Sequence, residues 1–75
     1  MTPLNMAREG EKVRVLKISG GRGFVQHLTE MGLYPGVVIE VISDGRRGPF
    51  IIGVGGLRLG IGFGMAKSIF VEQLG

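Results

Sequence analysis

Residues 30–36 read EMGLYPG, with two glycines and one proline in seven positions. Gly32 suits the left-handed conformation in which many helices end, and the Tyr-Pro-Gly sequence after it is typical of a turn that leads into a strand. We therefore expect a helix to end here and a strand to begin here. Leu33, between the two glycines, is expected to plug the end of the fold and to hold the helix across it.

The helix before this stretch is predicted to be short and amphipathic. Within residues 23–31, Phe24, Leu28 and Met31 stand at i, i+4 and i+7, which places them on one face of a helix. Polar residues fall on the other face. Phe24 should therefore point into the core.

Elsewhere the apolar residues recur with a period near two, which is the spacing of β-strands. The first strand changes phase after Val15, which indicates a β-bulge, and Gly55–Gly56 suits the tight turn of a hairpin. Glu40 is the one charge in a dense β-branched strand, so we expect it at an edge or at a rim. The five predicted strands cover residues 12–18, 36–42, 49–54, 57–61 and 68–74.

Two further helical turns complete the predicted elements. One lies at residues 64–68, and the other lies at residues 3–9, where Thr2 can cap the helix and Pro3 suits its first position. Five short strands with short helical segments predict a mainly β fold, a small closed barrel. The length allows one domain and not two, so we expect residues 1–75 to form a single domain.

The composition excludes several classes of protein. The chain has no cysteine, so neither a disulfide framework nor a Cys-type zinc site is available, which fits a reducing cytoplasm. Residues 49–65 are largely apolar, but the run is shorter than the roughly 20 residues of a membrane helix and carries Arg58 and six glycines. No secretory signal is expected either.

The net charge is +3, with nine lysines and arginines dispersed along the chain. Only Arg46 and Arg47 are adjacent, and they belong to residues 43–48, SDGRRG, which we expect to form an exposed, mobile loop. Dispersed charge on a small domain usually serves solubility. A small basic RNA-binding barrel is an alternative function, although nucleic acid is not the partner that we favour.

Catalytic and metal-binding groups are few. The chain has one histidine and no cysteine, no nucleophile with a base is visible, and we expect no enzyme. His27 and Glu30 would share a helix face, but a tight metal site takes three or four ligands. They are the only candidates for weak binding of Fe(II) or another divalent transition metal, and no other cofactor is expected. The core is expected to contain Met6, Met31 and Met65.

Residues 60–64 alternate glycine with Ile61 and Phe63, and this pattern allows two interpretations. In the first, both side chains are buried in the core. In the second, Phe63 is exposed on a flexible loop and anchors a partner protein. The sequence leaves both open.

These features, taken in order, resemble the ferrous iron transport protein A family, FeoA. The resemblance runs over nearly the whole chain and includes the hairpin at 54–59 and the sequence MAKSIFV at 65–71. Its most specific part resembles the family pattern L-x-x-M-G-L-x-P-G, formed here by Leu28, Met31, Gly32, Leu33, Pro35 and Gly36. This signature is structural, and the resemblance implies an SH3-like β-barrel.

The resemblance also implies a non-enzymatic accessory protein of ferrous iron uptake, located in the cytoplasm or peripherally at the inner face of the membrane. Its implied partner is the membrane permease with a GTPase domain that imports Fe(II). We expect docking surfaces around Tyr34, Arg46, Arg47 and Phe63, in which apolar anchors supply affinity and the arginines supply orientation. An open strand edge and an exposed Phe63 would also suit a homo-oligomer.

Two further points follow from the resemblance. Similar domains end the iron-dependent repressors after a DNA-binding helix-turn-helix, which this chain lacks. A regulatory domain that senses a transition metal directly through His27 and Glu30 is a second alternative. The family more often has a basic residue at the position of His27 and is expected to have a polar one at Phe63. The aromatic ring would therefore extend an apolar contact surface in this chain.

Overall fold

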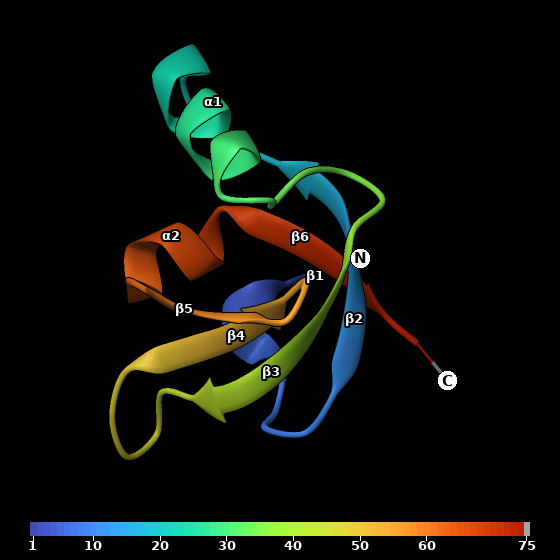
Figure 1. Ribbon diagram of the computed structural model, residues 1–75, viewed down its shortest axis with the longest axis vertical. Coiled ribbons are helices and arrows are strands. Elements are labelled where there is room, and N and C mark those ends of the chain that lie inside the picture. The colour runs from blue at the N-terminus through green and yellow to red at the C-terminus, as the bar shows by residue number, and fades with distance from the viewer. Residues whose placement is uncertain (75) are drawn as a thin grey trace.

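The computed structural model describes residues 1–74, which contain one six-stranded antiparallel sheet with short helices (Figure 1). The strand order is β1-β6-β2-β3-β4-β5. This confirms the predicted mainly β fold. The elements in chain order are β1 (Thr2–Pro3), the 3-10 helix η1 (Leu4–Met6), β2 (Lys12–Ile18), α1 (Arg22–Glu30), β3 (Val38–Asp44), β4 (Phe50–Val54), β5 (Leu57–Ile61), α2 (Phe63–Lys67) and β6 (Ile69–Gln73).

One hydrophobic core fills the inside of the curved sheet, because alternate residues of the longer strands point inward. Each fully buried aliphatic side chain contributes about 1.5–3 kcal/mol relative to exposure, so this core supplies most of the stabilisation. No charged or polar residue is buried within residues 1–74. The buried residues are Leu4, Val13, Val15, Leu28, Leu33, Ile39, Val41, Phe50, Ile52, Val54, Ile61, Ala66, Ile69 and Val71.

Two short helices, η1 and α2, bring the two terminal strands of the sheet together. η1 follows the terminal strand β1 and α2 follows the opposite terminal strand β5, and the two helices contact each other. Among the described strands, no ladder of hydrogen bonds joins β1 to β5. The barrel therefore closes through side-chain packing between η1 and α2.

The EMGLYPG stretch joins α1 to β3 as predicted. Gly32 has a φ of +93°, and the amide of Leu33 donates a hydrogen bond to the carbonyl of Leu28 at 2.9 Å. Leu33 is fully buried, so it plugs the end of the barrel beneath α1. Gly36 has a φ of +100°, and its amide donates to the carbonyl of Val15 at 2.7 Å, which docks the turn on β2.

The predicted bulge in β2 is also confirmed. The pairing of β2 with β6 shifts register between Val15 and Lys17. Leu16, at the bulge, is 38% exposed and points away from the core. A second bulge, in β3 between Val41 and Ser43, was not predicted.

Two local predictions were wrong. Thr2 does not cap a helix, because it pairs with Val71 as part of β1, and no side chain caps η1. Glu40 does not lie at an edge, because β3 is an interior strand; Glu40 is exposed on the outer face, opposite Lys12 and Gly53. None of the helices in residues 1–74 is long and apolar enough to cross a membrane.

Candidate functional site

The structure brings together two of the four predicted partner-binding residues and separates a third. Arg46 and Phe63 line one surface hollow. Tyr34 is 46% exposed, but it precedes the seven-residue strand β3 whereas Arg46 follows it. The length of β3 separates the two positions by roughly 20 Å. Figure 1 shows the corresponding segments at opposite ends of β3.

The hollow, here called the Phe63 hollow, has a volume of about 320 Å³. It lies between η1 and the residues after it, the β3–β4 loop, and the first residue of α2. Three segments far apart in the sequence therefore build it. Its lining consists of Asn5, Met6, Ala7, Arg8, Asp44, Gly45, Arg46 and Phe63.

Phe63 is held in place and exposed at the same time. It is 55% exposed, whereas Ile61 is 5% exposed, so only one of the two alternating side chains enters the core. The ring centroid of Phe63 lies 6.4 Å from that of Phe50, with the ring planes tilted by 45°. Phe63 begins α2, so the expectation of a flexible loop at this position is wrong.

Gly45 lies beside this aromatic pair. Its φ is +82°, and a Cβ atom built on it would lie 3.6 Å from Cδ2 of Phe50 and 3.7 Å from Cζ of Phe63, which are ordinary van der Waals distances. The positive φ of the turn after β3, and not a lack of space, is therefore what favours glycine at this position.

Asp44 anchors the β3–β4 loop. Its Oδ1 accepts a hydrogen bond from the backbone N–H of Arg46 at 3.2 Å, and its Oδ2 accepts one from the backbone N–H of Glu9 at 3.4 Å. The Nε atom of Arg46 lies 3.7 Å from Oδ2. The hydrogen bond from the Arg46 backbone, aided by the one from Glu9 and by the positive charge of Arg46, lowers the pKa of the Asp44 carboxyl.

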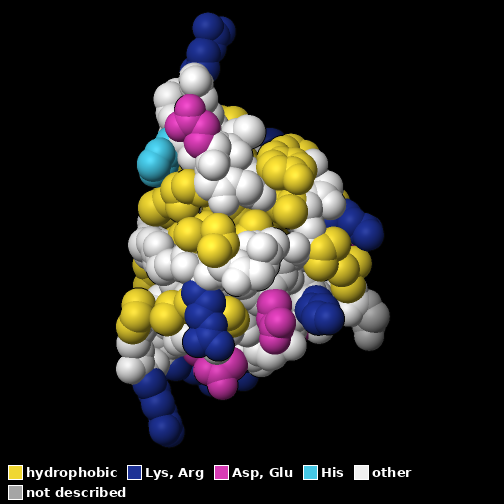
Figure 2. Space-filling model, viewed as in Figure 1, with side chains coloured by type: hydrophobic (Ala, Val, Ile, Leu, Met, Phe, Trp, Pro, Cys, Tyr) yellow, Lys and Arg dark blue, Asp and Glu magenta, His cyan; other side chains and the backbone are white. Residues whose placement is uncertain are grey.

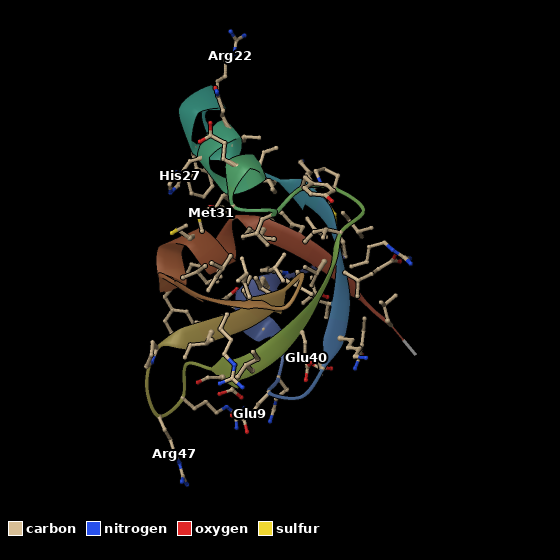
Figure 3. The ribbon with its side chains drawn as sticks, in the orientation of Figure 1. Glu9, Arg22, His27, Met31, Glu40 and Arg47 are labelled. Atoms are coloured by element: carbon tan, nitrogen blue, oxygen red, sulfur yellow. The ribbon has the colours of Figure 1, made fainter. Side chains whose placement is uncertain are left out.

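The arginines around the hollow differ in their surroundings. Arg8 lines the hollow and makes no ion pair within 4.0 Å in the described part of the chain. Arg47 does not line it; Figure 3 shows its side chain extending away from the molecule. The adjacency of Arg46 and Arg47 in the sequence therefore does not place both side chains beside Phe63.

Sequence reasoning missed three lining residues. Met6 was expected in the core, but it is 65% exposed at the hollow. Arg8 belongs to no sequence motif that would have singled it out. Asn5 also lines the hollow, and its buried Oδ1 has no hydrogen-bond partner among residues 1–74. No spacing rule links these residues to position 63, because their proximity arises from the contact between η1 and α2.

The signature residues serve the fold. Leu28 and Leu33 are buried, and Met31 is partly buried and packs against the core. Gly32 and Gly36 both have positive φ. These features describe a folding signature and give no chemistry.

The candidate metal ligands gain no third partner. His27 and Glu30 are both exposed on α1. Within residues 1–74, no group of three or more His, Cys, Asp or Glu side chains could hold a metal ion. The arrangement offers at most a solvated pair of ligands.

The basic residues do not gather into one groove on the face shown. In Figure 3, Arg22 and Arg47 point outward at opposite ends of the molecule. Figure 2 shows the Lys and Arg side chains of this face separated by apolar and acidic ones. This arrangement gives no specific support to RNA binding.

Comparison with known proteins agrees with the resemblance found in the sequence. A curated protein of Methanocaldococcus jannaschii, named "Putative Fe(2+) transport protein A", is 44% identical over 73 residues, which cover 97% of this chain and 88% of that protein. A crystal structure of an iron uptake regulatory protein (FeoA) has a TM-score of 0.87 at 42% identity, over 97% of this chain and 96% of that one.

The fold also occurs in regulators. A manganese-dependent transcriptional repressor has a TM-score of 0.84 at 19% identity, over 96% of this chain and 41% of the repressor chain, which is a likeness of fold alone. The FeoA domain profile, in contrast, matches residues 2–73. With this match over almost its full length, the chain belongs to the FeoA domain family.

Proposed function

We propose that this protein is a cytoplasmic accessory of ferrous iron uptake, which docks through the Phe63 hollow on the membrane permease that imports Fe(II). A role in ferrous iron uptake is supported by the name of the 44% identical relative. The docking surface rests on one observation: two large, exposed apolar side chains, Met6 and Phe63, share a hollow with Arg8 and Arg46.

The physical argument begins with the exposure of Phe63. Aromatic side chains and arginines are the residues that most often dominate protein interfaces, and they do so when a partner removes them from water. Because Phe63 already packs against Phe50, docking would immobilise few additional rotamers, which lowers the entropic cost of association. The ring of Phe63 would thus already have its position in the unbound protein.

The lining groups suit binding better than covalent chemistry. Of the side chains that usually act as nucleophiles or bases, the lining contains the Asp44 carboxylate alone, and this group already accepts two backbone hydrogen bonds. We therefore propose that the protein supports or regulates transport without catalysing a reaction. Its place at the inner face of the membrane would follow from the permease that it binds.

Anaerobic co-purification tests the proposal. The tagged chain is recovered from detergent-solubilised, nuclease-treated native cells as wild type, as Phe63→Ala and as the matched control Leu57→Ala. Leu57 is 67% exposed and does not line the hollow, so its loss removes a similar apolar surface elsewhere. We expect the permease with the wild type and with Leu57→Ala, and not with Phe63→Ala.

Two results would contradict the proposal in different ways. Permease recovered equally with Phe63→Ala would place the docking surface elsewhere. No permease with any variant, or ribosomal proteins in its place, would exclude the proposed partner. Circular dichroism of each variant establishes that the loss of binding is not a loss of fold.

A further inference from the structure

We propose that the Phe63 hollow recognises a short protein segment in which a large apolar side chain stands next to a carboxylate. The inference rests on the proposed function for the protein that carries the segment, and it adds the chemistry by which the segment is chosen. It treats Met6, Arg8 and Arg46 as specificity-determining residues alongside Phe63.

The apolar half of the site is formed by Met6 and Phe63. They come from η1 and α2, which contact each other, and they are 65% and 55% exposed. The volume of about 320 Å³ lies at the lower end of the range for ligand pockets, which is roughly 300–1,000 Å³. The hollow therefore suits one or two side chains of a partner, and the flexible Met6 can adapt to their shape.

The charged half of the site is formed by Arg8 and Arg46. Asp44 is the one carboxylate among the lining residues, and it already accepts hydrogen bonds from two backbone amides and faces Arg46. Arg8 makes no ion pair within 4.0 Å among residues 1–74, and its positive charge contributes, less than that of Arg46, to lowering the pKa of the Asp44 carboxyl. The lining thus keeps one uncompensated positive charge, and a guanidinium binds a carboxylate through two parallel hydrogen bonds.

Asn5 adds a polar group at the same place. Its buried Oδ1 lacks a hydrogen-bond donor, and the side chain lines the hollow. A rotation of this amide toward a bound segment would let it pair with a backbone N–H of that segment. A small molecule that resembles only the side chains has no backbone N–H, so this hydrogen bond would form only with a peptide.

A lipid surface is the main alternative occupant, since exposed Phe, Met and Arg also occur at membrane interfaces. Two features favour a protein segment. The first is that the apolar side chains line a concave site, which suits an inserted side chain better than a flat membrane surface. Arg47, which a flat basic surface would use, extends away from the hollow (Figure 3).

Peptide titration followed by amide NMR tests the recognition chemistry on the full chain. The probes are three capped tetrapeptides with central Leu-Asp, Leu-Asn or Ala-Asp flanked by glycine. We expect Leu-Asp to shift the amides of residues 5–8 and 45–46, and each of the other two to bind roughly tenfold more weakly, as expected for the loss of one charge-assisted hydrogen bond or one apolar contact.

Two variants test which residues of the hollow recognise the carboxylate and which recognise the apolar side chain. Arg8→Gln should abolish the preference for Leu-Asp over Leu-Asn, and Phe63→Ala should abolish detectable binding of all three. Arg58→Gln is the matched control, because Arg58 is exposed on β5 and does not line the hollow. Equal binding of Leu-Asp and Leu-Asn, or a preference that survives both Arg8→Gln and Arg46→Gln, would overturn the inference.

Two more outcomes separate this inference from the proposed function. Selective peptide binding without recovery of the permease would overturn the partner and leave the recognition chemistry standing. Recovery of the permease that depends on Phe63, with no peptide selectivity, would overturn the chemistry alone. Binding to vesicles of phosphatidylcholine and phosphatidylserine that is lost in Phe63→Ala, with no peptide bound, would replace the protein segment by a membrane surface.

Discussion

Phe63, at the start of α2, packs against Phe50 on β4, with 6.4 Å between the ring centroids. Phe50 is 3% exposed and belongs to the core, whereas more than half of Phe63 is exposed. One aromatic pair thus connects the core to the surface. A change in the core near Phe50 should consequently alter the Phe63 hollow as well as the stability.

Gly45→Ala tests this connection from the loop side. Position 45 has a φ of +82°, which strains any residue with a Cβ, and the added methyl would contact both rings. We expect the free energy of unfolding to fall by about 1–2 kcal/mol. Urea denaturation measures it.

Gly60→Ala is the control for that change. Gly60 lies within β5, its φ is not positive, and a Cβ built on it would meet no atom within 4 Å. We expect stability unchanged or raised by up to about 1 kcal/mol. Equal destabilisation by both substitutions would contradict the role given to Gly45.

Leu33→Ala tests the plug beneath α1. Leu33 is fully buried, and truncation of a buried leucine costs about 2–5 kcal/mol, which is comparable to the whole stability of a domain of this size. We expect a largely unfolded chain by circular dichroism at room temperature. Leu57→Ala removes the same atoms from a side chain that is 67% exposed and should leave the spectrum unchanged.

Asp44 should make stability depend on acidic pH. The pKa of its carboxyl is lowered in the folded chain, so the stabilisation is present above the pKa of the unfolded chain, about 3.9, and is lost as the pH falls through the lower folded value. Urea midpoints measured from neutral to acidic pH should decline less steeply below about pH 4 in Asp44→Asn than in the wild type. Identical slopes would show that Asp44 is not part of the acid transition.

His27→Ala tests the metal hypothesis. The two exposed ligands on α1 have no third partner in the described chain, and tight sites need three or four. We expect anaerobic calorimetry with Fe(II) and Mn(II) to give equally weak binding in the wild type and the variant. Tight binding that is lost with His27 would support a metal-sensing domain.

Features set by neighbouring residues could be predicted from the sequence. The helix before Gly32, the turn that ends at Gly36 and the bulge after Val15 follow from local periodicity and from glycine conformation. Features set by distant pairing could not. Thr2 looks like a helix cap until Val71 pairs with it, and Glu40 looks like an edge residue until the strand order is known.

The candidate site shows the same division. The sequence allowed Phe63 to be buried or exposed, because an alternation of glycine and apolar residues does not say which side chain meets a partner within the chain. Met6 and Arg8 were missed since they reach Phe63 only through the contact of η1 with α2. The local sequence pattern therefore identified Phe63 as a candidate, whereas the residues that surround it are brought there by the tertiary structure.

The pairing of Thr2 with Val71 also has a consequence during synthesis. β1 has no strand partner until β6 has been synthesised, because β6 is the one strand with which it pairs among the described residues. A nascent chain without β6 can form the pairs among β2, β3, β4 and β5, but its N-terminal strand stays unpaired. The segment that carries Asn5 and Met6 to the Phe63 hollow is therefore fixed late in synthesis.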